Sequence, residues 1–257
     1  MTTTTLTPPC VALDDAIPTL QRQGYAVLSA PSVFALTQTD LTDLMALVPS
    51  WNELPPDQYL KDGGRYRRRR HASYVIQDGQ LQAVAHRAHW QPLEYNALHG
   101  GMQRWFDPME PATVGLPVWQ RILVRLGEAV SALHGARPWY VEAHPFRIDT
   151  TDGIGRPTPE GAHRDGVDLV AVFMLERHAI KGGESRVFEA AGPAGQRFTL
   201  REPWSLLLLD DARVIHETTP IQPLVTGELG WRDTLVLTYR RGGFQGEGAD
   251  AGQKGAR

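Results

Sequence analysis

The second half of the 257-residue chain constrains the fold most, because it consists of short apolar segments separated by turn residues. Pairs such as Asp152-Gly153, Gly182-Gly183 and Asp210-Asp211 stand between these segments, and pairs of this kind typically form turns. Short strands at such spacing are typical of a β-sandwich or a jelly roll. Strands are expected over residues 141–148, 168–175, 185–189, 196–200, 205–209, 213–216 and 232–239.

The first half predicts helices that cover one face of this sheet structure. The clearest is a helix over 117–134, which begins at Pro117 and stops at Gly135, and whose apolar residues recur at helical spacing. Shorter helices are expected over 11–23 and from an N-cap at Thr39 to Val48, with a strand at 24–28. The expected fold class is therefore α+β, mainly β, with a jelly roll buttressed by helices from the N-terminal half.

Composition narrows the environment and the partners. Apolar residues make up 42% and charged residues 21% of the chain, and the net charge of -3 favours neither nucleic acid nor an anionic membrane as a partner. The single cysteine, Cys10, excludes a disulfide within the chain and a cysteine-based metal site, and it is typical of a reducing compartment. No apolar run approaches the ~18 residues that span a bilayer, and no secretory signal is visible. We therefore expect a cytoplasmic protein.

The expected organisation is one domain with short tails. Residues 1–9 are rich in threonine and proline, and residues 242–257 hold few apolar side chains. Segments of this composition have little to bury, so both are predicted to be flexible. The domain is expected over 10–241, with its jelly-roll core at about 140–241.

One triplet carries the candidate metal chemistry. His163 is the only one of the nine histidines with an aspartate two positions later, Asp165, and the triplet follows a Pro-Glu-Gly turn before a strand. Residues i and i+2 of an extended chain project to the same face. His216 ends another expected strand, which in a jelly roll can lie opposite the first. Two imidazoles and one carboxylate on one side of a metal leave three positions open, an arrangement that suits non-haem Fe(II).

The open positions predict a cosubstrate. 2-Oxoglutarate would chelate the iron through one carboxylate and its keto oxygen, leaving one position for O2. Its distal carboxylate requires a fixed cation, which arginine supplies best. Arg232 opens the last expected strand, and Thr234 faces the same side while Asp233 faces the other. Arg232 and Thr234 are therefore the expected cosubstrate-binding residues.

A family resemblance rests on these same residues. The chain resembles the bacterial 2-oxoglutarate/Fe(II) dioxygenases that include free L-isoleucine hydroxylases, over roughly residues 60–241. The similar segments are PTPEGAHRDGVDLVAVFML, KGGESRVF, LLLLDDARVIHETTPI and WRDTLVLTYRR. The resemblance implies a double-stranded β-helix, iron ligands at His163, Asp165 and His216, and Arg232 on the distal carboxylate. Such enzymes hydroxylate free aliphatic amino acids or oxidise methionine to its sulfoxide, so the resemblance also implies a small-molecule substrate of that class.

The substrate pocket is expected between the segment 65–76 and the strand at 141–148. Candidate substrate-binding residues are Arg67, Arg69, His144 and Thr158. The Arg65–Arg70 run allows three interpretations, namely ion pairs, recognition of a substrate carboxylate, or binding of nucleic acid phosphates. The negative net charge and the lack of a second basic stretch make nucleic acid the least favoured of these.

Two other function classes fit the same residues. A zinc-dependent hydrolase would use the same two histidines and aspartate but would give Arg232 no role. A non-catalytic regulatory or binding module would use an Arg-rich surface at Arg65–Arg70, and its partner binding would be sensitive to salt.

Overall fold

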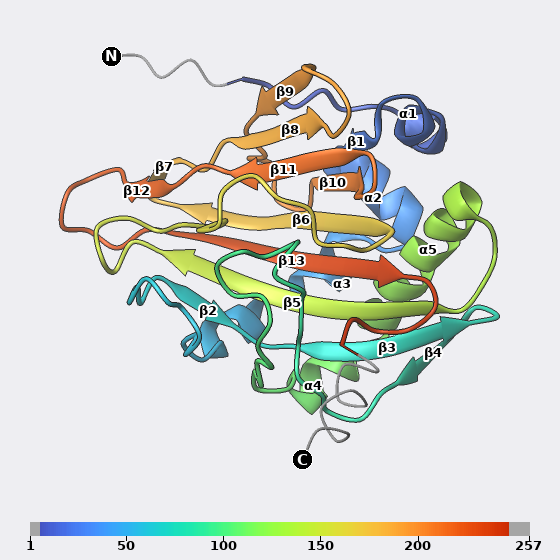
Figure 1. The fold of residues 1–257 in the computed structure, drawn as a ribbon, viewed down its shortest axis with the longest axis horizontal. Helices are drawn as coiled ribbons and strands as arrows, with labels where there is room; N and C mark the ends of the chain where they lie inside the picture. Colours follow the sequence, from blue (N-terminus) through green and yellow to red (C-terminus); the bar gives the residue numbers. More distant parts are fainter. Residues whose placement is uncertain (1–5, 247–257) are drawn as a thin grey trace.

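A large antiparallel sheet forms one layer of the molecule (Figure 1). The computed structural model describes residues 6–246. In spatial order the strands of this sheet are β1 (Tyr25–Leu28), β10 (Leu206–Asp210), β6 (Leu169–His178), β13 (Trp231–Arg240), β5 (Trp139–Asp149), β3 (Ala72–Gln77) and β4 (Gln80–Ala83), and β2 (Arg67–Arg69) also pairs with β5.

A smaller sheet lies over one end of the large one. It consists of β11 (Val214–Thr218), β8 (Ser185–Glu189) and β9 (Gly195–Phe198), and a two-stranded pair joins β7 (Ile180–Gly182) to β12 (Ile221–Pro223). Apolar side chains from the two layers form a shared core that includes Val170, Val187, Phe198, Leu209 and Val214. Two facing antiparallel layers confirm the predicted jelly roll.

Helices from the first half cover the outer face of the large sheet, as predicted (Figure 1). The longest is α5 (Pro117–His134), whose ends agree with the prediction to the residue. Its Leu123 carbonyl accepts a hydrogen bond of 2.8 Å from the Tyr239 hydroxyl of β13, and its Trp119 indole donates one of 2.9 Å to Tyr74 of β3. The other helices are η1 (Leu13–Asp15), α1 (Ala16–Gln23), α2 (Ala30–Thr37), α3 (Leu41–Met45), η2 (Val48–Glu53) and α4 (Pro111–Val114).

The helix predicted over 39–48 begins and ends elsewhere. Its N-cap is Asp40, whose carboxylate accepts a 2.8 Å hydrogen bond from the Asp43 backbone. The Thr39 hydroxyl lies 2.7 Å from that of Thr37 instead. Two adjacent residues could both cap this helix, and the capping box that Asp40 forms with Asp43 satisfies two backbone N–H groups where Thr39 would satisfy one.

The predicted C-terminal tail starts too early. Phe244 and Gln245 are buried, so the chain stays packed for several residues beyond β13. At the other end, the Leu6 carbonyl accepts a 3.1 Å hydrogen bond from the Thr199 backbone. The remainder of both predicted tails, residues 1–5 and 247–257, lies outside the described residues. Within the described part of the chain, no helix combines the length and apolarity that a bilayer crossing requires.

Candidate active site

The structure brings the three predicted metal ligands together. His163 and His216 form an isolated antiparallel bridge, in which the backbone N–H of each donates to the carbonyl of the other at 3.0 and 2.9 Å. Asp165 follows in the same turn, and its two carboxylate oxygens lie 3.8 Å from His163 Nε2 and 3.6 Å from His216 Nε2. One ligand atom from each residue lies within 4.8 Å of the other two.

The protonation of these groups fits a bound dication. His163 Nδ1 lies 2.9 Å from the Gly161 carbonyl, which can only accept, so Nδ1 carries a proton and Nε2 is the nitrogen that can bind a metal. Burial, with a contribution from His163, lowers the pKa of His216 to about 3, so this imidazole is neutral. Burial also raises the pKa of the Asp165 carboxyl. Burial lowers the pKa of His163, but the neighbouring carboxylates of Asp165 and Glu160 outweigh this effect and raise that pKa above its ordinary value. A buried carboxylate such as Asp165 requires a cation to balance it. A metal ion on His163 Nε2 would take the place of the proton there, and two imidazoles with one carboxylate are a donor set that suits Fe(II).

Asp211 holds the turn that carries Asp165. Its buried carboxylate accepts hydrogen bonds from the backbone N–H groups of Asp165, Gly166 and Val167 at 3.0, 2.7 and 3.1 Å. Gly166 has a φ of +76°, and a Cβ there would lie 2.3 Å from the Tyr95 ring. The turn therefore requires glycine both for its backbone conformation and for the close approach of the ring.

Two glutamines from distant segments fix Asp165 further. Gln91 Nε2 donates to Asp165 Oδ1 at 3.1 Å. Gln245, from the segment predicted to be a tail, donates from Nε2 to the carbonyls of Asp165 and Gly166, each at 2.8 Å. The backbone carbonyl of Gln245 accepts a 3.0 Å hydrogen bond from the guanidinium of Arg87. Contacts of this kind orient a ligating carboxylate before any metal binds.

The predicted cosubstrate residues lie in the same cavity as the triad. Arg232 on β13 is 3% exposed and its Nε is buried without a hydrogen-bond partner among the described residues. Burial and the nearby Arg177 lower its pKa to about 9, so the guanidinium is still charged at neutral pH. Thr234 lines the same cavity, while Asp233 faces away and pairs with Arg147 at 2.6 Å. The opposite facing of Thr234 and Asp233 agrees with the prediction.

All four predicted substrate residues line this cavity, whose volume is about 130 Å³. Arg67 Nε donates to Asp57 at 2.7 Å, and Arg69 donates to His144 Nδ1 at 2.7 Å. The Thr158 hydroxyl is engaged by the backbone of β11, because it donates to the Thr218 carbonyl at 3.0 Å and accepts from the Thr218 N–H at 3.1 Å. Thr158 therefore fastens the metal turn to β11.

The arginine run does not form one continuous basic surface. Arg67 and Arg69 are buried. Arg65 pairs with Asp152 at 2.7 Å, Arg68 with Asp149 at 3.6 Å and Arg70 with Glu110 at 2.5 Å. Of the three interpretations, ion pairing explains most arginines of the run. Arg69 has no such pair with another described residue and instead lines the cavity.

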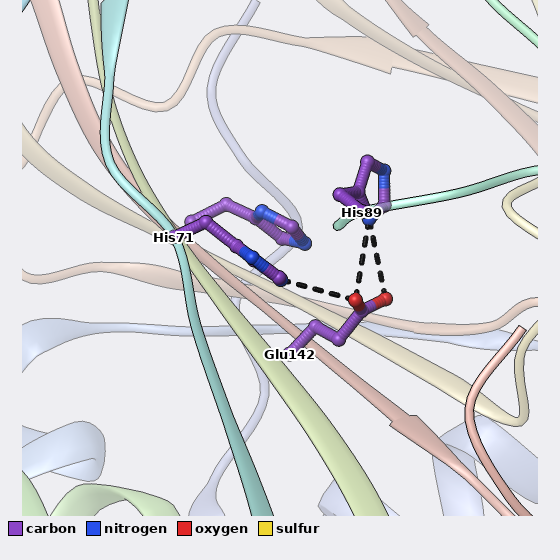
Figure 2. Close-up of side chains that lie close together, drawn as sticks. His71, His89 and Glu142 are labelled. Carbon is purple, nitrogen blue, oxygen red and sulfur yellow. Dashed lines mark hydrogen bonds and ion pairs between the residues drawn. The ribbon is translucent and has the colours of Figure 1, made fainter. Parts of the chain in front are cut away.

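A second cluster of metal-capable side chains contributes to the same cavity, and Figure 2 labels three of its members. His71, His89, Glu142 and His144 are all buried and bring one ligand atom each within 4.8 Å of one another. Glu142 Oε1 lies 3.0 Å from His71 Nε2, and its carboxylate oxygens both lie 3.3 Å from His89 Nδ1. The ring of His144 stacks on that of His71 with centroids 4.9 Å apart.

Two guanidiniums decide the chemistry of this second cluster. Arg87 donates to Glu142 Oε1 at 2.9 Å, and Arg69 donates to His144 Nδ1 at 2.7 Å. Burial lowers the pKa of His89 to about 3. Burial alone would raise the pKa of Glu142, but the nearby His89 and His71 hold it well below its usual range. Like charges about 4 Å apart repel by about 4 kcal/mol in a partly polar interior, so these arginines favour a hydrogen-bonded network over a second metal.

Several cavity residues escaped sequence reasoning. Gln91, Arg104, Glu142 and Glu160 all line the cavity. Gln91 and Arg104 lie in a long segment without regular structure, so no periodicity marks them. Glu142 is a charged residue at a position where the strand pattern predicts a buried side chain. Such a buried charge is the one sequence signal that could have marked a residue of the cavity.

Comparison with known proteins decides the class. The model of a family described as 2OG-Fe dioxygenase matches residues 48–238, well over half of the chain. The chain belongs to the 2OG-Fe dioxygenase family. Enzymes of this family use Fe(II) and 2-oxoglutarate, so the protein is an oxidoreductase, and neither the zinc hydrolase nor the non-catalytic module is needed to explain its metal-capable site.

Solved structures share the fold of this dioxygenase. A bsmA homolog from Methylobium petroleophilum is 53% identical and superimposes with a TM-score of 0.88, covering 93% of this chain and 97% of its own. IDO from Bacillus thuringiensis is 15% identical and has a TM-score of 0.69, and the match covers 90% of this chain and 99% of IDO. The Fe(II)/(alpha)ketoglutarate-dependent dioxygenase TqaL is 18% identical and has a TM-score of 0.70, and the match covers 91% of this chain and 89% of TqaL. The last two show a shared fold. No curated protein matches the chain.

Proposed function

We propose that this dioxygenase hydroxylates or sulfoxidises a free L-amino acid, with Fe(II) held by His163, Asp165 and His216. The observation that carries the proposal is the convergence of these three side chains, within 4.8 Å of one another, on a cavity that also contains Arg232. The chemistry supplied by bound Fe(II) and 2-oxoglutarate is oxidation of a C–H bond or a sulfide by O2, with 2-oxoglutarate converted to succinate and CO2.

In this proposal the chain's own residues bind, orient and exclude water. Arg232 supplies the buried cation for the distal carboxylate of 2-oxoglutarate, and its unpartnered Nε supports that role. Thr234 adds a hydroxyl on the same wall. Arg232 is 3% exposed, and a charge-assisted hydrogen bond is strong in such a site. No side chain is required as a general base.

The size and charge of the cavity support a small anionic or zwitterionic substrate. A volume of about 130 Å³ admits a metabolite-sized group, and the guanidiniums of Arg67 and Arg69 line it. The resemblance to free amino acid hydroxylases points to the same class. With a single, free Cys10, we place the enzyme in the cytoplasm, where thiols stay reduced.

The first test is spectroscopic and needs no substrate. Under anaerobic conditions, Fe(II) plus 2-oxoglutarate should give wild-type protein a visible charge-transfer band, and His163→Ala should abolish it because one ligand is lost. Arg232→Gln should show the band only at much higher 2-oxoglutarate concentration, whereas Arg197→Gln on the exposed strand β9 should behave as wild type. A wild-type protein without the band would contradict the proposal.

The second test identifies the substrate. Free amino acids, with methionine, isoleucine and leucine first, are screened for stimulation of succinate formation. The proposal expects at least one strong response in the panel. A uniform absence of stimulation alongside a normal charge-transfer band would leave the dioxygenase intact and remove the amino acid from the proposal.

A further inference from the structure

Most charged side chains around the cavity have a structural partner. Arg67 pairs with Asp57 at 2.7 Å, where both side chains are buried. Arg87 pairs with Glu142 at 2.9 Å. Arg69 lies between two aromatic rings, with its guanidinium carbon 3.7 Å from the centroid of Phe106 and 4.4 Å from that of Phe146. Cation–π contacts on both faces stabilise this charge without a carboxylate.

Apart from Arg232, which is assigned to the cosubstrate, and Arg69 between its two rings, Arg104 is the cavity arginine without a carboxylate partner within 4.0 Å among the described residues. Its guanidinium carbon lies 5.9 Å from the centroid of the Phe106 ring, farther than that of Arg69. The Arg104 side chain is 2% exposed and lines the cavity. One amino group donates to the neutral amide oxygen of Gln91 at 2.9 Å, while Nε is buried without a partner among residues 6–246. Burial and the neighbouring Arg67 lower its pKa to about 10, so it stays protonated at neutral pH. A buried cation without a counter-ion costs several kcal/mol.

Glu160 is the corresponding anion. Its side chain is 12% exposed and lines the same cavity. Glu160 Oε2 is fully buried and has no hydrogen-bond partner in the described part of the chain. Glu160 Oε1 lies 3.6 Å from His163 Nε2, the nitrogen that is assigned to the iron. Glu160 is close enough to Arg104 to raise the pKa of that guanidinium, yet within 4.0 Å no ion pair joins these two described side chains.

Arg104 and Glu160 each lie close to a different residue of the triad. Arg104 is one hydrogen bond from Gln91, which donates to Asp165 at 3.1 Å. Glu160 lies against His163. A molecule placed between the two charges would therefore sit next to the metal ligands. The backbone of Arg104 is fixed by a reciprocal pair of hydrogen bonds with His89, at 2.9 and 3.0 Å, so its side chain projects from a defined position.

We propose that Arg104 binds the α-carboxylate of the substrate and that Glu160 binds its α-ammonium group. This inference rests on the proposed amino acid activity and names the residues that recognise the amino acid. A free α-amino acid supplies one anion and one cation on a single carbon. With Arg232 assigned to the cosubstrate, Arg104 supplies the matching cation and Glu160 the matching anion in the cavity. An internal peptide residue supplies neither charge, and an N-acylated amino acid supplies only one. The pocket is thereby selective for the free zwitterion.

The test measures binding by calorimetry, under anaerobic conditions, to protein loaded with Fe(II) and 2-oxoglutarate. Three ligands are compared: the best amino acid of the panel, its 2-hydroxy acid, which lacks the ammonium, and its carboxamide, which lacks the carboxylate. Glu160→Gln and Arg104→Gln should each raise the Kd of the amino acid by roughly 30-fold or more. Glu160→Gln should leave the 2-hydroxy acid within about threefold of its wild-type Kd, and Arg104→Gln should do the same for the carboxamide.

Matched controls separate this result from loss of structure. Glu94→Gln, on the same segment as Arg104, and Arg68→Gln, outside the cavity, should bind the amino acid as wild type. Both cavity variants must keep the charge-transfer band, and Arg104→Lys serves where Arg104→Gln does not fold. Wild-type affinity in either cavity variant would overturn this inference alone. A wild-type protein that shows the band but binds no amino acid would overturn the amino acid proposal and this inference together.

Discussion

Two clusters of histidine and carboxylate contribute side chains to one cavity, and their composition alone does not distinguish them. Both bring every ligand atom within 4.8 Å of the others. In the triad, the Asp165 carboxylate oxygens lie 3.8 Å from the imidazole nitrogen Nε2 of His163 and 3.6 Å from that of His216. In the second cluster, Glu142 has imidazole nitrogens at 3.0 and 3.3 Å.

The difference lies in the neighbouring charges. Guanidiniums contact Glu142 and His144 directly, at 2.9 and 2.7 Å. Asp165 accepts hydrogen bonds instead from the neutral amides of Gln91 and Gln245, and its backbone N–H donates to the carboxylate of Asp211. A cation is therefore already present where Glu142 lies and is still needed where Asp165 lies. Neighbouring charge, more than ligand count, separates a metal site from a polar network.

Metal stoichiometry gives the largest contrast between the clusters. Wild-type protein should bind one Fe(II) per chain, and His216→Ala should bind close to none and lose all 2-oxoglutarate turnover, because a ligand of the facial triad is removed. The matched variant His89→Ala should still bind one. Elemental analysis after anaerobic loading and desalting measures both. A second equivalent of metal in wild type that disappears in His89→Ala would assign a metal to the Glu142 cluster.

Stability gives the next contrast. Glu142→Gln leaves the guanidinium of Arg87 without its carboxylate and should lower the free energy of unfolding by about 3 kcal/mol. The matched variant Glu128→Gln removes an exposed pair with Arg125 and should change it by less than about 0.5 kcal/mol. Urea unfolding of both variants compares them directly. An equal effect in the two variants would show that the Glu142 network does not stabilise the fold.

The pH dependence of stability gives the smallest effect. The pKa of His89 is about 3 in the folded protein because the ring is buried, and it is about 6.5 in an unfolded chain. The unfolded state therefore binds more protons between pH 3 and 6.5, so this histidine lowers stability as pH falls through that window. Within this pH window, His89→Gln should reduce the slope of the unfolding free energy against pH by at most about 1.4 kcal/mol per pH unit. An unchanged slope would mean that folding does not lower the pKa of His89.

The sequence predicted the elements that follow simple periodicity. The strand over 185–189 and the helix over 117–134 agree with the structure to the residue. The metal triad followed from residue spacing and strand facing, and the backbone bridge between His163 and His216 is the contact that this reasoning requires.

Most of the missed parts lacked periodicity or depended on distant contacts. The β3–β4 hairpin is an exception, because its turn is Asp78-Gly79 with φ of 52° and 72°, and an Asp-Gly pair between strands favours a hairpin. Gln91 has no comparable mark, because its role depends on a contact with Asp165, 74 positions away. The start of the C-terminal tail was misplaced for the same reason, since composition does not show that Gln245 reaches back 80 positions to Asp165.

The packing of Gln245 has a consequence for how the enzyme is handled and made. A chain cut after Arg241 would keep every strand of both sheets and still lose the amide that holds the Asp165 and Gly166 carbonyls. The turn that carries Asp165 is thus completed by residues that leave the ribosome after the barrel itself. Affinity tags and fusion partners belong at the opposite end of the polypeptide.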